Sequence, residues 1–322
     1  MKSWKSFAAM MLASAIVGPL AQAATYPDKP VTLIVPYPPG GATDVVARLI
    51  AQRLSDDWKQ QVVVNNKPGA GTTIAAEFVA RSPGDGYTLY ETTAAHTISA
   101  SLYSRLNYDP IKDFAPVTLT VTIPLVLVTA PGVPAKNLQE LITYAKESPN
   151  GVTVASTGNG TPQHLTAELF KEKTGAKLVH VPYKGDAPMV TDLMGGQVQM
   201  AFVTLSAALP HIKSGKLNAI ALAHPRRVEA ISNVPTMAEA GMPGFEAATW
   251  FGLFGPASLP NDMRQKIYQD VSRIVAQPDV TKMLQDMGGD VNNSSPEEFQ
   301  KFINAEAARW GEAVKLSGAR VD

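Results

Sequence analysis

One stretch near the N-terminus decides the fold, and it reads Val31-Thr-Leu-Ile-Val-Pro-Tyr-Pro-Pro-Gly-Gly-Ala-Thr-Asp-Val-Val-Ala-Arg-Leu-Ile-Ala-Gln-Arg-Leu54. The apolar run at its start is typical of a strand that is buried on both faces. The prolines that follow end this strand, because proline cannot donate to a sheet ladder. In the second half, apolar residues spaced three and four apart predict a helix. The stretch therefore predicts a strand, a glycine-rich turn and a helix.

The turn of this unit is a candidate binding site for an anion. Gly40 and Gly41 allow positive φ and close approach of a ligand, and Thr43 or Asp44 can cap the helix. For Asp44, capping or pairing with Arg48 is favoured over a role as a general base. Unpaired N–H groups at a helix N-terminus attract carboxylates and phosphates. A tight turn that binds nothing is the alternative, and these residues alone leave both open.

Residues 1–23 have the features of a signal peptide that is removed on export. Lys2 and Lys5 precede an apolar run over 7–17, and Ala21-Gln-Ala23 matches the small-x-small pattern before a cleavage site. The run is too short to span a bilayer, which needs about 20 apolar residues. The chain contains no cysteine, which excludes disulfides, thiol catalysis and cysteine-ligated metals. We expect a periplasmic protein that is stabilised by its core.

The length that remains after cleavage, about 300 residues, is more than one core usually covers and predicts two domains. The full chain carries 28 basic and 28 acidic side chains. Removing Lys2 and Lys5 leaves 26 basic against 28 acidic groups, a net charge of −2. No nucleic-acid partner is implied by this balance.

The alternation of strand, small-residue turn and helix recurs along the chain. Further strands are expected at 61–65, 87–92, 152–156, 177–182, 199–204 and 217–223. The apolar stretch over 117–129 is the longest after the signal, and we expect Pro124 to divide it into two strands and to mark a crossing between domains. Trp250–Pro256 predicts a strand that returns.

Two sheets joined by two crossings predict an α/β protein with two lobes, a mixed sheet in each lobe and a cleft between them. The first lobe is expected to comprise 24–123 and 250–322, and the second 124–249. Glycine-rich strand ends from both lobes then face the cleft, where ligands bind in open α/β sheets. This is the organisation of a hinged binding protein.

Several motifs follow one another in a defined order, and they read Tyr26-Pro-x-Lys-Pro-Val, Val35-Pro-Tyr-Pro-Pro-Gly-Gly-x-x-Asp-x-x-Ala-Arg, Gly158-Asn-Gly-Thr-Pro-Gln-His-Leu, Val181-Pro-Tyr-Lys-Gly, Ala208-Leu-Pro-His-Ile, Val234-Pro-Thr-x-x-Glu-Ala-Gly and Gly318-Ala-x-Val-Asp. In this order they resemble the Bug family, the TctC-like receptors of tripartite tricarboxylate transporters. The resemblance covers essentially the whole mature chain. It implies a periplasmic solute receptor with a two-lobed, type 2 Venus-flytrap fold, a small organic carboxylate as ligand, membrane transporter subunits as partners, and no cofactor or metal. We expect a monomer.

The resemblance also implies that a ligand carboxylate is held between the turns 37–41 and 156–163, partly through ordered water. The candidate ligand-binding residues matched by motif are Tyr37, Gly40, Gly41, Ser156, Thr157, Asn159, Gly160, Thr161, Gln163 and Tyr183. Thr93, His96 and Thr204 join them from strand ends, and Asp186 from the start of a helix. Neutral partners and water suit a transport receptor, because a ligand held in this way leaves no buried counter-ion behind on release.

The chain departs from the family pattern at three positions. Val203 stands where relatives often carry an aspartate, Asp186 stands where small or hydroxyl residues are usual, and Glu91 lies in a strand where relatives are commonly apolar. Asp186 can either cap its helix or face the distal end of the ligand. The second role leads to the hypothesis that the ligand carries one carboxylate and an uncharged or cationic distal group.

Two other classes of function are the alternatives. An exported α/β enzyme is disfavoured, since the chain contains no Gly-x-Ser-x-Gly elbow and no metal-ligand spacing, and neither His96 nor His164 has a partner at motif spacing. No catalytic residue is therefore expected. A receptor that presents its ligand to a membrane sensor kinase is compatible with the same sequence. Trp250 can form a pocket wall or pack at the hinge, and Lys184 is expected to face solvent.

Overall fold

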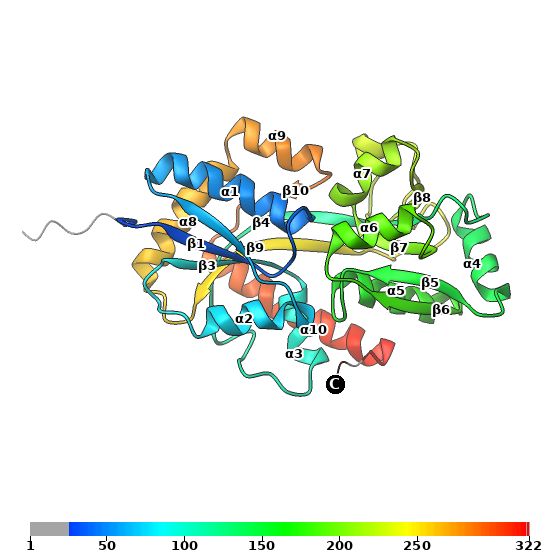
Figure 1. Ribbon diagram of the computed structural model, residues 1–322, viewed down its shortest axis with the longest axis horizontal. Coiled ribbons are helices and arrows are strands. Elements are labelled where there is room, and N and C mark those ends of the chain that lie inside the picture. The colour runs from blue at the N-terminus through cyan, green and yellow to red at the C-terminus, as the bar shows by residue number, and fades with distance from the viewer. Residues whose placement is uncertain (1–25, 320, 322) are drawn as a thin grey trace, which may run out of the picture.

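The computed structural model describes residues 26–319 and residue 321 (Figure 1). The predicted signal peptide lies outside the described residues. The strands are β1 (Val31–Val35), β2 (Val62–Asn66), β3 (Thr88–Thr93), β4 (Phe114–Thr129), β5 (Val152–Ser156), β6 (Leu178–Pro182), β7 (Met200–Thr204), β8 (Asn218–Leu222), β9 (Ala248–Pro256) and β10 (Asp290–Val291). The helices are α1 (Ala42–Trp58), α2 (Thr73–Ala80), α3 (Ala95–Leu102), α4 (Leu138–Glu147), α5 (Pro162–Thr174), α6 (Asp186–Met194), α7 (Leu205–Lys213), α8 (Asn261–Val275), α9 (Pro278–Asp286) and α10 (Pro296–Ser317), with short 3-10 turns η1 (Ala70–Thr72) and η2 (Glu229–Ile231).

The sheet has two parts, and β4 and β9 connect them. The strand order is β2-β1-β3-β9-β4-β7-β5-β6, with β10 and β8 also paired to β4. We call the elements around β1, β2, β3 and β10 lobe 1, and those around β5, β6, β7 and β8 lobe 2. Neighbours within β2-β1-β3 and within β7-β5-β6 are parallel, whereas every pairing with β4 or β9 is antiparallel. The prediction of a two-lobed α/β fold with a mixed sheet in each lobe and two crossing strands is confirmed.

β4 corrects the prediction that Pro124 divides the apolar stretch into two strands. Its residues 114–124 pair with β9, and its residues 125–129 pair with β7 and β8. Pro124 lies between these two sets of partners, since pairing with β10 ends at Thr122 and pairing with β7 begins at Leu125. The missing N–H of Pro124 therefore falls at the change of partners, and one strand passes from lobe 1 into lobe 2.

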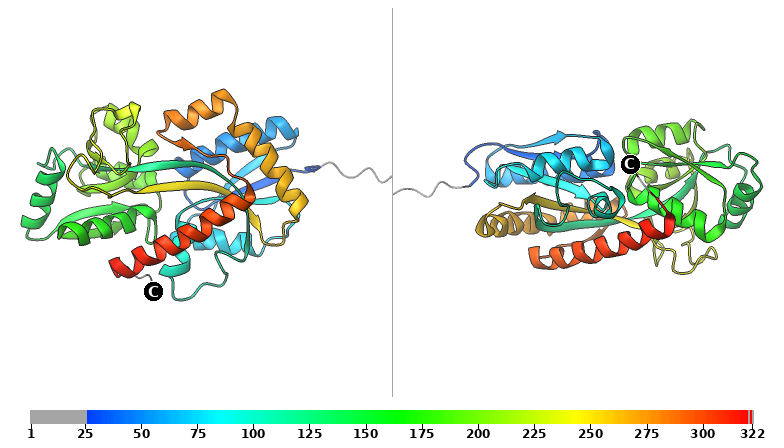
Figure 2. Two further views of the ribbon diagram at one scale, coloured as in Figure 1. Left: turned by 180° about the vertical axis from the view of Figure 1, so that it is seen from behind. Right: turned by 90° about the horizontal axis from the view of Figure 1, so that it is seen from below.

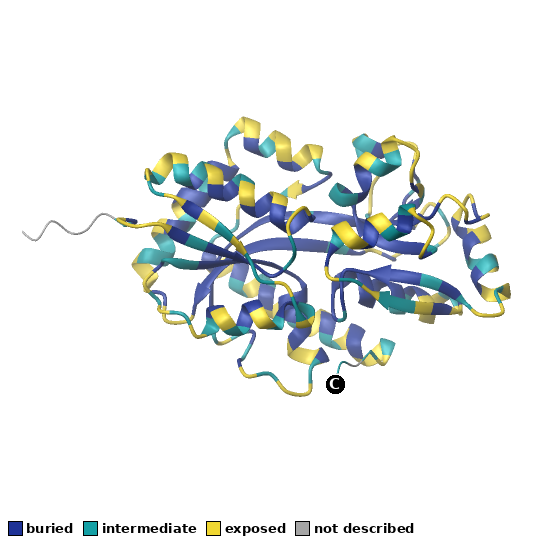
Figure 3. Cartoon of the chain, viewed as in Figure 1, coloured by how far each residue is buried: buried dark blue, intermediate teal, exposed yellow. Residues whose placement is uncertain are grey.

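Helices cover both faces of the sheet in each lobe, and the central strands between them are buried, whereas the edge strands β2 and β6 are partly exposed (Figures 1 and 3). In lobe 1, α1 packs against α8 on one face, and α2 and α3 lie on the other. Helix α10 begins at a capping box of Ser295 and Glu298, and it runs from lobe 1 to lie against α5 of lobe 2 (Figure 2). Within the described ranges, no helix combines the length and apolar character that crossing a bilayer requires.

Two roles were considered for Trp250, a pocket wall and packing at the hinge, and the structure shows packing. It is 1% exposed, and its indole N–H donates to Oε2 of Glu306 over 3.0 Å. Its ring packs edge-on against Phe299. The residue thus attaches β9 to α10 where β9 passes between the lobes. Thr249 and Phe251, which precede and follow Trp250 along the strand, face the cleft.

Candidate functional site

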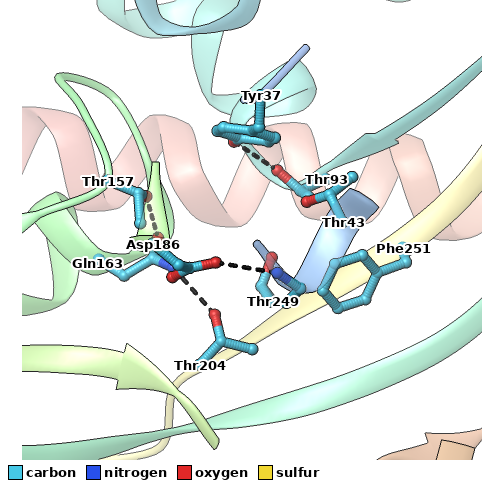
Figure 4. Close-up of a pocket in the computed structure, with 10 residues that line it drawn as sticks. Tyr37, Thr43, Thr93, Thr157, Gln163, Asp186, Thr204, Thr249 and Phe251 are labelled. Carbon is cyan, nitrogen blue, oxygen red and sulfur yellow. Dashed lines mark hydrogen bonds between the residues drawn. The ribbon is translucent and has the colours of Figure 1, made fainter. Parts of the chain in front are cut away.

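A small cavity lies between the lobes at the N-terminal ends of α1, α5 and α6 (Figure 4). We call it the inner cavity. Its volume is about 10 Å³, which is room for one water-sized group. Its lining residues are Tyr37, Ala42, Thr43, Thr93, Thr157, Gln163, Asp186, Thr204, Thr249 and Phe251. Hydroxyl, phenol, amide and carboxyl groups from both lobes therefore converge on this one point.

On the lobe 1 side, the α1 turn forms as predicted, but protein carboxylates occupy its N–H groups. Asp44 accepts from the backbone N–H of Gly40 over 3.0 Å and from the Arg48 Nε–H over 2.8 Å. Burial opposes ionisation of Asp44, yet these hydrogen bonds and one from Asn66 hold its pKa below the ordinary value. The expectation that Asp44 pairs with Arg48 is confirmed. The Gly40 N–H, which was a candidate donor to an anionic ligand, donates to Asp44 within the turn.

Asp186 provides the second carboxylate at this helix end, and it comes from the other lobe. Its Oδ2 accepts from the backbone N–H of Ala42, the first residue of α1, over 3.3 Å. Its Oδ1 is buried and has no hydrogen-bond partner among the described residues. Burial raises the pKa of Asp186 to about 6. Asp186 is the first residue of α6, but it bonds to α1 instead of capping its own helix by a side-chain hydrogen bond.

On the lobe 2 side, the α5 turn is stabilised by neutral partners. Thr161 caps α5 by accepting from the N–H of His164, and Nδ1 of His164 accepts from the N–H of Gly160 over 3.2 Å. The His164 ring stacks on His180 at 4.0 Å, and His180 lies 2.6 Å from the Ser156 hydroxyl. Burial lowers the pKa of both histidines to about 4, so both rings are neutral at pH 7. His164 therefore packs against His180 and completes the α5 turn.

Hydroxyl groups and one amide connect the cavity wall. The amide of Gln163 accepts from the hydroxyl of Thr157 over 3.1 Å and donates to the hydroxyl of Thr204 over 3.1 Å. From lobe 1, the hydroxyl groups of Tyr37 and Thr93 lie 3.0 Å apart (Figure 4). Burial raises the pKa of the Tyr37 phenol, so it remains protonated. All of these groups can rotate or exchange donor and acceptor roles, which suits reversible binding.

A larger hollow, which we call the outer cavity, adjoins the inner one at Tyr37 and Thr157. It has a volume of about 280 Å³. Its lining residues are Pro36, Tyr37, Pro68, Gly69, Ala70, Gly71, Thr72, Tyr103, Thr157, Gly158, Asn159, Pro182, Tyr183, Lys184 and Val321. The candidates Asn159 and Tyr183 lie here, and the Tyr183 hydroxyl donates to Asp192 over 2.8 Å. Lys184, expected to face solvent, is exposed and also borders this cavity.

The lobes approach each other closely at two glycines. A Cβ atom on Gly71 would lie 2.6 Å from the backbone oxygen of Asn159 in lobe 2. A Cβ on Gly160 would overlap the side chain of Leu102 in lobe 1. Gly160 also has a φ of +74°, which side chains rarely adopt. Glycine therefore permits the contact between the lobes at both places.

Two polar residues singled out in lobe 1 lie in its core instead of the cavity wall. His96 is 0% exposed on α3, where its ring meets Phe114 edge-on at 4.5 Å. Burial lowers the pKa of His96 to about 4. Its proposed ligand contact came from its place after a strand, but the helix that starts at Ala95 turns the ring inward. Glu91 is also fully buried, both of its carboxyl oxygens lack partners among the described residues, and burial raises its pKa to about 8.

The remaining candidates lie in the turns themselves. Three further residues of the inner cavity wall were not predicted from the sequence. Gly41 is the N-cap of α1 and touches Asp186, whereas Ser156, Gly160 and Thr161 shape the α5 turn. The missed residues are Ala42, Thr249 and Phe251. Thr249 and Phe251 alternate with the buried Trp250 on β9, so the period of two along the predicted return strand could have indicated them. Thr43, considered only as a cap, also lines the cavity.

A sheet that crosses twice between two lobes, with a polar cavity at the crossing, defines the class of two-lobed solute receptors. The chain belongs to the TctC family, described as the tripartite tricarboxylate transporter family receptor, whose model matches residues 46–318. Its family and fold are those of solute-binding receptors and not of enzymes. The resemblance inferred from the motifs is confirmed.

Relatives support this assignment over nearly the whole chain. Protein BugT of Bordetella pertussis is 36% identical over 314 residues, which cover 97% of this chain and 96% of BugT. The solved structure of an R. palustris protein with adipate is 36% identical, with a TM-score of 0.89, and the match covers 92% of this chain and 100% of that chain. MatC from Rhodopseudomonas palustris with bound malate is 33% identical, with a TM-score of 0.86, over 90% of this chain and 100% of MatC.

Proposed function

We propose that the protein is a periplasmic receptor that captures a small organic carboxylate between its two lobes. One observation carries the proposal: the N-terminal turns of α1 and α5, from opposite lobes, meet at one cavity walled by hydroxyl groups. Hydroxyl groups can donate to a carboxylate without a fixed counter-ion. Adipate and malate in the two similar structures support a carboxylate as the ligand class.

The ligand enters, on this proposal, through the outer cavity and closes the lobes around itself. The inner cavity, at about 10 Å³, takes one small group, whereas the outer cavity, at about 280 Å³, has room for the body of a small acid. Neutral donors line the path from Thr157 to Asn159. A carboxylate bound by such groups is released readily when the lobes open, because no buried cation is left unpaired.

Binding is tested by a thermal-shift screen of mono-, di- and tricarboxylates, aromatic acids and amino acids against the mature protein. An acid at 100 times its dissociation constant stabilises the folded state by about 2.7 kcal/mol and raises the melting temperature by several degrees. Mass spectrometry of the ligand after incubation is the control for turnover. The proposal fails if no acid stabilises the protein or if the bound acid is converted.

Hinged closure forms part of the proposal. The moving units are taken as 24–123 with 250–322, and 124–249, because β4 exchanges its lobe 1 partners for lobe 2 partners at Pro124 and β9 begins close by. Small-angle scattering with and without saturating ligand measures the change in radius of gyration. An unchanged radius would mean that the lobes do not move about these crossings.

We further propose that the loaded receptor delivers its ligand to membrane subunits of the tripartite tricarboxylate type. Membership of a receptor family named for these transporters supports this partner. The measurement is uptake of the labelled acid by cells that lack the receptor, cells that lack the membrane subunits, and cells with both restored. Normal uptake without the receptor would contradict the proposal.

A further inference from the structure

The inner cavity contains a negative charge and no compensating positive side chain. Among its lining residues, all of which the structure describes, Asp186 is the one with a charged side chain at pH 7. The others present hydroxyl groups, the Gln163 amide or apolar surface. In the outer cavity the charged lining side chain is Lys184, of opposite sign. The path into the cleft therefore runs from a positive outer part to a negative inner end.

Asp186, which lines this inner end, retains one carboxyl oxygen without a hydrogen-bond donor among the described residues. Its Oδ2 is engaged by the Ala42 N–H, but its Oδ1 is buried without a partner among the described residues. Figure 4 shows the carboxyl group among Thr157, Gln163 and Thr249 at the centre of the cavity wall. A buried carboxylate oxygen without a donor is costly, and a donor supplied by a ligand removes that cost.

A carboxylate of the ligand does not suit the inner cavity on grounds of charge or size. It would place a second negative group beside Asp186, and like charges in a poorly solvated site repel strongly. A volume of about 10 Å³ accepts one water-sized group, such as an ammonium or a hydroxyl group, but not the three heavy atoms of a carboxylate. At the α1 end, Gly40 and Ala42 already donate to Asp44 and Asp186.

We propose that Asp186 selects ligands that carry one carboxylate and, at the other end, a small hydrogen-bond donor, either an ammonium or a hydroxyl group. The donor enters the inner cavity and bonds to Oδ1 of Asp186. The carboxylate stays in the outer cavity, beside the Thr157–Asn159 turn and Lys184. This inference deepens the proposed carboxylate receptor function and rests on it.

The inference is tested with four sets of linear acids, and the members of each set differ only at one end. Each set pairs an α,ω-dicarboxylate with the amine and the alcohol of the same chain, as in glutarate, 4-aminobutyrate and 4-hydroxybutyrate, for chains of two to five methylene groups. Calorimetry with the mature protein at pH 7.5 gives the dissociation constants. For the chain length that fits, the amine or alcohol is expected to bind at least about tenfold more tightly than the dicarboxylate.

The variant Asp186→Asn retains shape and can still accept from Ala42, but it lacks the charge. It is expected to reduce the preference for amine over dicarboxylate by about tenfold or more. The matched control is Glu172→Gln, which removes the same charge from an exposed position on α5 of the same lobe and should leave the preference as in the wild type. Circular dichroism confirms that each variant is folded.

The possible outcomes separate this inference from the proposed function. Three results would each overturn the role of Asp186. The first is a dicarboxylate that binds more tightly than its amine and alcohol at every length, and the second is binding confined to acids without a donor group. The third is a preference that is unchanged in Asp186→Asn. The carboxylate receptor proposal would survive all three results. If neither these acids nor those of the wider screen bind, the proposed function itself is overturned.

Discussion

The α1 turn of lobe 1 and the α5 turn of lobe 2 have the same local design but opposite electrostatic character. Both consist of a buried strand, a run of small residues and a helix whose N-terminus faces the cleft. At α1 the backbone N–H groups donate to two carboxylates, Asp44 and Asp186. At α5 they donate to the hydroxyl of Thr161 and to the neutral ring of His164. A glycine-rich turn before a helix therefore predicts an anion site only where no side chain of the protein takes the anion's place.

The largest expected effect comes from a side chain on Gly160 in the α5 turn. Gly160→Val is expected to weaken ligand binding at least 100-fold, because the added atoms overlap Leu102 and hold the lobes apart. Gly40→Val is the matched control, since Gly40 also has positive φ, +89°, but a Cβ there meets no atom within 4 Å. Calorimetry and scattering measure affinity and closure. Equal losses in the two variants would show that backbone strain, and not contact between the lobes, is responsible.

The second prediction concerns the pH dependence of stability through Asp186. Its folded pKa, about 6, exceeds its ordinary value of 3.8, so its contribution to stability is greatest below pH 3.8 and is lost as the pH rises through 6. The phenol of Tyr37 and the α1 backbone face it, and neither titrates in this range. Asp186→Asn is therefore expected to be about 2 kcal/mol more stable than the wild type at pH 7, and the difference should vanish near pH 4.

Urea unfolding without ligand at pH 4, 5.5 and 7 measures this difference. The variant must be compared with the wild type at each pH, because other buried groups also change stability with pH. Glu91, with a pKa of about 8, lowers stability as the pH rises. The three histidines with pKa values of about 4 raise stability as the pH rises from 4 to 6.5, and they are His96, His164 and His180. These contributions cancel when the two proteins are compared. A difference that does not change with pH would mean that Asp186 is solvated in the folded protein.

The third prediction tests the neutral cap of α5. Thr161→Ala removes the side chain that accepts from His164, and it is expected to reduce the free energy of unfolding by about 1 kcal/mol. The melting temperature and the urea midpoint at pH 7 report the loss. No measurable loss would indicate that water replaces the hydroxyl group at this helix end.

The smallest effect is expected at the corresponding position of α1. Gly41 is the N-cap there, it makes no side-chain cap, and its φ of −83° is open to any residue. A Cβ would lie 3.4 Å from Oδ2 of Asp186, which is an ordinary contact. Gly41→Ala is therefore expected to cost about 0.5 kcal/mol or less in urea unfolding. A larger loss would show that the Asp186 contact tolerates no added atom.

Most elements of this fold could be predicted from the sequence, because their signals are local. β5 has the predicted bounds, and β2, β3, β6, β7 and β8 differ from their predicted ranges by one residue at one or both ends. Apolar runs, prolines and glycines act within a few residues of the chain, so their effect on the backbone can be read without tertiary information. The exceptions are β10, which was not predicted, and β4, in which a proline lies within a continuous strand.

The composition of the cavity wall depended more on tertiary structure. Thr93 and Thr204 end strands, and this position predicts their place in the wall, whereas Tyr37, Thr157 and Gln163 were predicted from the family motifs. The same argument fails for His96, because α3 begins there and the direction of a helical side chain is set by what packs against it. Thr249 and Phe251 were not predicted, because only the packing of Trp250 into the core determines which face of β9 borders the cavity.

The amino-acid sequence alone was sufficient for the two lobes, the family and the polar turns, since each rests on motifs and periodicities within short segments. Only the tertiary structure decided which polar groups meet. The contact between Asp186 and Ala42 joins residues 144 positions apart on different lobes, and it exists because the packing of the two lobes brings two helix N-termini together. No local pattern encodes that approach, so the negative charge at the inner end of the cleft emerged only from the arrangement of the lobes.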